Sequence, residues 1–166
     1  MGLENCPKNY IKYLGVWMDK NMTFNEHITR MANRAGETVA ALGRLMPNVG
    51  GPKASKRRTM SSVAHSIMLF AAPVWEGALK IVKIREKFAR VQRQMALRIS
   101  SAYRTASREA VLVIAEIPPT ELLARERVEV YEEIPKGEAR NRLMQDWQRQ
   151  WTHNVEPSGQ SVRSQT

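Results

Sequence analysis

The chain has 166 residues, a length that predicts one domain able to bury a core without disulfides or metals. Its 26 lysine and arginine residues against 16 aspartate and glutamate residues give a formal charge of +10, which favours a polyanionic partner, nucleic acid first and anionic membrane second. The single cysteine, Cys6, excludes an intramolecular disulfide and a thiolate zinc cluster, and it favours an intracellular location, nuclear or cytoplasmic. No apolar run approaches the ~20 residues that cross a bilayer, so no transmembrane segment is expected.

The positive charge is concentrated in the middle of the chain. Residues 26–104 carry fifteen basic and four acidic side chains, whereas residues 105–166 carry eight basic and ten acidic ones. Residues 1–25 are nearly neutral, with three basic and two acidic groups. The division indicates a basic face and not a generally basic protein.

The N-terminal part predicts a short strand followed by a long amphipathic helix. Residues 11–18 are rich in β-favouring side chains, with Gly15 as an interruption. Thr23 and Glu26 fit a capping box, with Thr23 as the N-cap. Apolar residues then recur at three- and four-residue steps up to a helix end near Met46, before Pro47.

Two strongly basic helices are predicted next. One begins at Pro52 and ends or kinks at Pro73, and its first turns carry cations that the helix dipole disfavours. The other spans about residues 80–102 with Glu86 as the only acid, so its cations lack the mixed signs of an ordinary solvated helix. Shorter helices are predicted at residues 107–115, 120–134 and 137–151.

These elements predict a mainly α fold, a helical bundle with a short N-terminal β-strand and a disordered C-terminal tail. We expect residues 1–22 to form a strand and turn, 23–104 a basic helical bundle, 105–152 further helices, and 153–166 the tail; the resemblance described below implies a palm edge, a thumb and a post-thumb segment for the first three. Trp75, Trp147 and Trp151 fit either core packing or stacking on bases, and their helical spacing favours the core.

The sequence predicts no catalytic or metal site. His27, His65 and His153 show no metal-ligand spacing, and the only aspartates, Asp19 and Asp146, stand in unrelated segments. Two-metal phosphoryl transfer needs clustered carboxylates, and no phosphate-cradling glycine motif occurs. We therefore expect no cofactor and no small-molecule substrate.

Residues 13–19, YLGVWMD, resemble the KYLGV-x-LD motif of reverse transcriptases from non-LTR (LINE-like) retrotransposons, where it closes the palm before the thumb. Further pieces of the chain are similar to that family in the same order. They are Phe24 with His27-Ile28 (F-x-x-HI), 44–52 (RLMPN-x-GGP), 66–75 (S-x-LLYGAPVW), 93–98 (QRRMALR), 117–123 (IPP-x-x-LL) and 147–151 (WQ-x-x-W). The similarity runs from about residue 11 to residue 151 and is greatest to insect-type elements.

The resemblance implies the palm end, thumb and post-thumb segment of an RNA-directed DNA polymerase. The family's Mg2+-binding aspartates lie upstream in an (F/Y)-x-DD motif that this chain lacks, so the chain alone is expected to be inactive. Its implied partners are RNA or RNA–DNA duplex and the remainder of the polymerase. The implied phosphate contacts, which hold register without reading sequence, are Lys53, Lys56, Arg57, Arg58, Lys83, Lys87, Arg90, Arg93 and Arg98.

Two alternatives belong to other classes. One is an inert remnant of a retrotransposon without a selected function. The other is a co-opted helical module whose basic face binds an acidic protein or a membrane surface, which would require an exposed apolar face opposite its lysines. Both predict weak or absent salt-dependent binding of nucleic acid. A further alternative is that the basic face is an ordinary solvent-exposed helix surface without a binding partner.

Overall fold

A computed structural model of the chain describes residues 9–45, 47 and 50–155. Within them the fold is mainly α, a helical bundle with a short two-stranded sheet, which confirms the predicted class. The elements are β1 (Tyr10–Tyr13), β2 (Val16–Asp19), α1 (Asn25–Leu45), α2 (Ala54–Met68), α3 (Ala72–Trp75), a 3-10 helix η1 (Glu76–Lys80), α4 (Val82–Ser100), α5 (Arg108–Ala115), α6 (Thr120–Tyr131) and α7 (Lys136–Val155).

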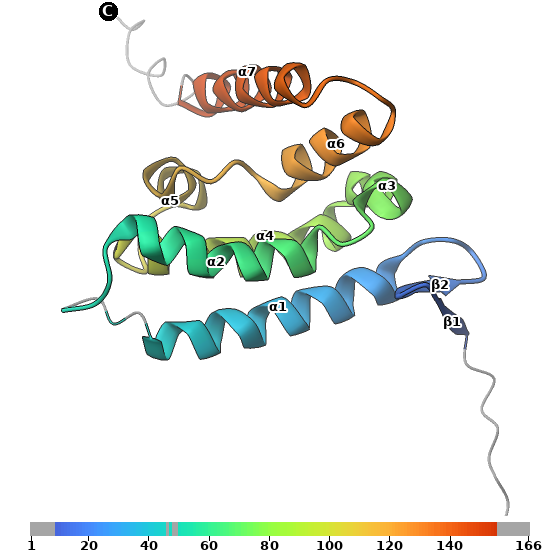
Figure 1. Cartoon of the computed structure of the whole chain (residues 1–166), viewed down its shortest axis with the longest axis horizontal. Helices are drawn as coiled ribbons and strands as arrows, with labels where there is room; N and C mark the ends of the chain where they lie inside the picture. Colours follow the sequence, from blue (N-terminus) through green and yellow to red (C-terminus); the bar gives the residue numbers. More distant parts are fainter. Residues whose placement is uncertain (1–8, 46, 48–49, 156–166) are drawn as a thin grey trace, which may run out of the picture.

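The helices stack in tiers (Figure 1). Helix α1 forms one side of the molecule, and α2 and α4 both pack against it. Helix α5 packs on α4, α6 packs on α3 and η1, and α7 lies outermost against α6. The hairpin of β1 and β2 lies beside the start of α1. No helix in the described part of the chain is long and apolar enough to span a membrane.

The predicted single strand is in fact a hairpin. Tyr13 pairs with Val16 across a two-residue turn, in which Leu14 has a φ of 46° and Gly15 a φ of 86°. Two left-handed residues in succession match the tight hairpin turn that suits strand twist, and glycine adopts this conformation without steric cost. A Cβ on Gly15 would also lie 3.0 Å from the Phe70 ring. The strand therefore has its partner within the same segment.

The start of α1 is held by Asp19 and not by the predicted capping box. The Asp19 carboxylate accepts hydrogen bonds from the backbone N–H groups of Asn21, Thr23 and Phe24 and from the Thr23 hydroxyl at 2.7 Å. These bonds, the Thr23 hydroxyl first, lower the pKa of Asp19 below its usual value. Glu26 pairs with Arg30 at 2.6 Å instead of reaching back to Thr23.

Several predicted boundaries change. Helix α2 begins at Ala54 and ends at Met68, and Ala71 with a φ of 54° separates it from α3. Pro73 therefore lies in the first turn of α3, which suits its fixed φ, and does not end α2. Helix α7 continues to Val155, so residues 153–155 of the predicted disordered tail are helical. The rest of that tail, residues 156–166, lies outside the described residues.

One hydrophobic core joins the early and late helices. Trp75 is 0% exposed, donates its indole N–H to the Phe70 carbonyl at 2.7 Å and packs on the Phe88 ring at 5.4 Å. This confirms the predicted packing role of Trp75. Leu122 and Leu143 belong to the same core, so α6 and α7 hold the bundle from the side away from α1.

Candidate nucleic-acid interface

Helix α4 has one buried face and one basic face. The residues Ile84, Phe88, Val91, Met95 and Ile99 are buried at three- and four-residue steps. The other side carries Lys83 and Arg90, which are exposed, and Lys87 and Arg98, which are half-buried. The steps of four, three and eight residues between these four cations place them along one side of the helix. Four of the five predicted phosphate contacts on this helix thus lie on one side of it, and Arg93 does not.

The cations of α4 stand without carboxylate partners. Salt bridges among the described residues involve α1, α2 and the helices from α5 onward, and none involves an α4 side chain. Lys87 donates instead to the neutral oxygens of Asn25, at 2.6 Å, and Thr29, at 2.5 Å. These bonds attach α4 to α1 and leave the positive charge uncompensated. The face is thus open to an external anion.

Arg57 differs from the other predicted contacts because it is buried, with 4% of its surface exposed. Its guanidinium donates to the Pro52, Arg98 and Pro47 carbonyls and to the Ser101 hydroxyl at 2.7–3.0 Å. It satisfies carbonyls at the end of α4 and in the α1–α2 connection, where helix ends leave acceptors unpaired. We assign Arg57 a structural role and leave it out of the interface.

Arg58 also serves the fold. Its Nε donates to the Ala115 carbonyl at 3.1 Å, and its guanidinium pairs with Glu116 at 3.2 Å. Both partners lie at the end of α5, so Arg58 fastens α2 to that helix. Lys53 and Lys56 are exposed at the first turn of α2, at the end of the bundle where Arg57 reaches Ser101.

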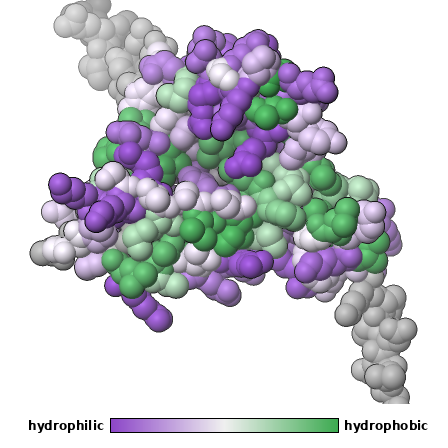
Figure 2. Space-filling model, in the orientation of Figure 1, coloured by the Kyte–Doolittle hydropathy of each residue, from purple (hydrophilic) through white to green (hydrophobic). Residues whose placement is uncertain are grey.

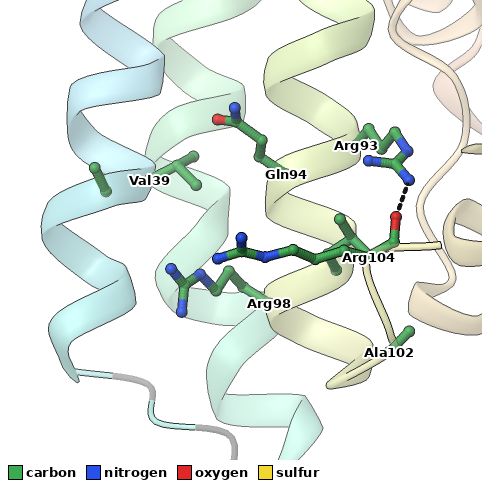
Figure 3. A pocket seen from close by; sticks show the side chains of 8 residues that line it. Val39, Arg93, Gln94, Arg98, Ala102 and Arg104 are labelled. Carbon is green, nitrogen blue, oxygen red and sulfur yellow. Dashed lines mark hydrogen bonds between the residues drawn. The ribbon is translucent and has the colours of Figure 1, made fainter. Parts of the chain in front are cut away.

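A hollow of about 530 Å³ opens between α1 and the end of α4. Arg98 and Arg104 extend their guanidinium groups toward α1 (Figure 3). Arg93 points to the other side and donates to the Arg104 and Ala106 carbonyls at 2.6 and 2.8 Å, which fixes the loop that carries Arg104. The lining residues are Val39, Ala40, Arg93, Gln94, Leu97, Arg98, Ala102 and Arg104.

Sequence reasoning missed two parts of this hollow. Arg104 follows α4 in a loop, where no helical period signals its direction. Gly43 stands inside α1, and a Cβ there would lie 3.1 Å from Cζ of Arg98 and 3.2 Å from its Nε. Glycine in a helix interior costs about 1 kcal/mol relative to alanine. Its effect here is to give the Arg98 guanidinium room against the α1 backbone.

The buried side of α4 contains a polar link that sequence reasoning also missed. Gln92 is fully buried, donates to the Pro118 carbonyl at 2.8 Å and accepts from the Thr120 N–H at 3.0 Å. Its amide nitrogen lies 3.3 Å from Nε2 of His65 on α2. Burial lowers the pKa of His65 to about 4, so the ring is neutral at pH 7 and able to accept this hydrogen bond.

The two aspartates take structural parts. Asp19 caps the turn before α1, and Asp146 pairs with Arg125 and Arg149. Among the described residues, no group of three or more metal-ligating side chains comes together. What the arrangement offers chemically is an anion-binding face with a hollow at one end.

The geometry thus describes a helical bundle with one uncompensated basic face. The chain is 28% identical over 170 residues to the putative 115 kDa protein in the type-1 retrotransposable element R1DM of Drosophila melanogaster. The alignment covers 88% of this chain and 17% of that protein, so the chain spans about a sixth of its relative's length. The chain is therefore related to a non-LTR retrotransposon protein. No family model matches the chain, and no solved structure does.

Proposed function

We propose that this chain is the thumb region of a retrotransposon RNA-directed DNA polymerase and that it binds RNA or RNA–DNA duplex through the basic face of α4. The relationship to the retrotransposon protein supports the class. The resemblance of residues 11–151 to the palm end and thumb of non-LTR reverse transcriptases supports the assignment to that region. On this proposal the chain supplies contacts to the duplex, and the Mg2+-dependent chemistry belongs to the palm of the polymerase.

The observation that carries the proposal is the excess of cations on α4, none of which forms a salt bridge among the described residues, with Glu86 as the one acid of the helix. A single salt bridge at a protein surface stabilises the fold by little. Helix α4, however, carries six cations and one acid, and an external polyanion would reduce the repulsion among these cations. Duplex phosphates supply one negative charge per ~1.7 Å of helix axis. The proposed duplex contacts are Lys83, Lys87 and Arg90 along α4, with Lys53 and Lys56 exposed near the start of α2. Arg93 and Arg98 lie where α4 borders the hollow.

The remainder of the polymerase is the second proposed partner. Figure 2 shows a band of apolar residues across the face at the level of α1 and α2, while hydrophilic residues dominate at the level of α7. The hairpin adds Ile11 and Leu14, which are 64% and 80% exposed. Exposed apolar residues of this kind, together with the outer edges of a two-stranded sheet, fit a neighbouring part of a longer protein.

The test is fluorescence anisotropy of the full chain with an RNA–DNA hybrid across a salt series. Binding should weaken linearly in log salt, with a slope that counts the phosphates contacted at about 0.9 each. The variant K83E/R90E should lower that slope by about two and weaken binding strongly at low salt. The matched control is R127E/K136E, which reverses two exposed cations on α6 and α7 and changes the net charge equally.

Equal losses in both double variants would show that net charge alone governs binding and would contradict the assignment to α4. Weak, salt-independent binding by a folded chain would contradict the proposal altogether and favour the inert remnant. Stronger binding to anionic vesicles than to the hybrid would favour the co-opted module instead.

A further inference from the structure

The hollow between α1 and α4 differs in kind from the basic face of α4 beside it. Lys83 and Arg90 of that face are exposed on the surface of α4, where they can contact a continuous backbone, whereas Arg98 extends into the hollow. The hollow is a recess of about 530 Å³ with α1 on one side and the residues following α4 on the other. Its volume falls within the ~300–1,000 Å³ typical of small-ligand sites. A recess of this size admits a single group or a chain end, and not a duplex backbone.

Two guanidinium groups converge there without an internal counter-charge. Arg98 and Arg104 both point toward α1 (Figure 3), and no carboxylate is among the described residues that line the hollow. Two cations held on one side of a recess repel each other, and an anion between them removes that cost. Each guanidinium presents a planar fork that fits phosphate oxygens in a bidentate manner.

The surrounding residues hold this pair in place. Gly43 leaves room for the Arg98 guanidinium against α1, at the cost of a glycine in a helix interior. Arg93 clamps the loop of Arg104 by donating to two of its carbonyls. The guanidinium of Arg57 binds the Arg98 carbonyl and the Ser101 hydroxyl, which fixes the end of α4. The hollow is thus built by residues from three separate segments.

We infer that this hollow binds the phosphomonoester of a nucleotide, between the guanidinium groups of Arg98 and Arg104. A phosphomonoester carries a charge of about −1.5 to −2 at pH 7, which matches two guanidinium groups better than the single charge of a backbone diester. Val39, Leu97 and Ala102 supply an apolar wall beside it for the sugar or base. The inference rests on the proposed function, and its nucleotide has two sources, the 5′ end of a bound strand or a free mononucleotide.

The experiment compares hybrids of one sequence whose overhanging strand ends in a 5′ phosphate or a 5′ hydroxyl, by anisotropy at fixed salt. The phosphorylated hybrid should bind about tenfold more tightly, a difference of about 1.4 kcal/mol, because its end group adds charge-assisted hydrogen bonds to the two guanidinium groups. R104A should abolish this preference and R127A, the removal of an exposed arginine on α6, should leave it intact. G43A keeps every charge but places a methyl group against the Arg98 guanidinium, so it should also reduce the preference while its melting temperature stays unchanged or rises.

A competition experiment decides whether the bound phosphomonoester belongs to a strand end or to a free mononucleotide. Displacement of the phosphorylated hybrid to the level of the hydroxyl hybrid by adenosine monophosphate, but not by adenosine or inorganic phosphate, supports the site with a free nucleotide as its ligand. Preference for the phosphorylated end without such displacement supports the strand end. Equal affinity for the two hybrids, with the salt slope still present, overturns the inference and leaves the proposed function standing. Absence of all salt-dependent binding overturns both.

Discussion

Helices α4 and α7 are of similar length and both rich in arginine, yet they handle charge differently. In α7, Arg142 and Arg149 pair with acids one turn away, and Arg140 pairs with Glu126 on α6. In α4 the cations meet neutral oxygens or solvent, and none of those described meets a carboxylate. Since both helices fold, the unpaired charge of α4 is not a requirement of helix formation. It marks α4 as the helix whose charge is available to a partner.

The cations at the start of α2 differ from those of both helices, because one of them is buried and the lysines near it are exposed to solvent. Arg57 binds four acceptors inside the protein, whereas Lys56, one residue before it, is exposed. Replacing Arg57 with alanine should lower the free energy of unfolding by about 3–5 kcal/mol, because buried acceptors are deprived of a charged partner. Urea denaturation followed by circular dichroism measures this effect.

The matched change K56A should alter the unfolding free energy by no more than about 0.5 kcal/mol, as expected at an exposed site. Equal stability of R57A and K56A would contradict the structural role of Arg57. It would also return Arg57 to the set of residues available for binding phosphate.

The contact between His65 on α2 and the buried side of α4 should make the stability of the fold sensitive to acid. His65 has a pKa of about 4 in the folded protein against an ordinary value of 6.5, so the unfolded chain binds the proton more readily. Stability is therefore fully present above pH 6.5 and falls by about 1.4 kcal/mol per pH unit on acidification toward pH 4. His27, whose pKa is also lowered by burial, adds a decrease of the same sign.

The variant H65Q should flatten this pH dependence by about one proton, because an amide oxygen accepts from Gln92 without titrating. Urea midpoints at pH 7 and pH 5 give the comparison. An unchanged pH dependence in H65Q would show that other groups cause the decrease in acid.

A carboxylate introduced one turn away from the arginines of α4 should pair with them, as the acids of α7 pair with its arginines. Gln94 is exposed and lies four residues from both Arg90 and Arg98, so the change Q94E lets a carboxylate pair with either. We expect affinity for the RNA–DNA hybrid to fall about tenfold, roughly the 1.4 kcal/mol expected when one cation no longer binds a phosphate. Anisotropy at fixed salt measures the change. Q148E, at an exposed site on α7, is the control and should have little effect.

Much of the fold follows from apolar periodicity, which is a local property. Apolar residues at helical spacing predicted α1, α2, α4 and α7. The hairpin escaped prediction because two four-residue strands around Gly15 have the same composition as one strand with an interruption. Whether Asp19 or Thr23 caps α1 depends on a chain reversal that brings a carboxylate back over the turn, and residue preferences do not encode that geometry.

The candidate site was less predictable because its decisive contacts are distant in sequence. Arg57 is buried by partners 41 and 44 residues away, at Arg98 and Ser101. A run of basic residues at the start of a helix gives no sign of which one turns inward. The hollow joins α1 to the loop after α4, so neither Gly43 nor Arg104 carries a signal until the two segments meet.

The smallest expected effect is that of D146N, which tests whether affinity for the hybrid depends on the basic face of α4 or on the net charge of the chain. Asp146 pairs with Arg125 and Arg149, and D146N raises the net charge by one while freeing both arginines on the far helices. We expect stability to fall by no more than about 1 kcal/mol, since these pairs are partly exposed. Affinity for the hybrid should stay within error of the parent protein. A rise that mirrors the fall in Q94E would mean that the duplex senses the sum of charges, because the two variants change that sum equally in opposite directions. An unchanged affinity, beside the decrease in Q94E, would place recognition on the helix whose cations have no partners of their own.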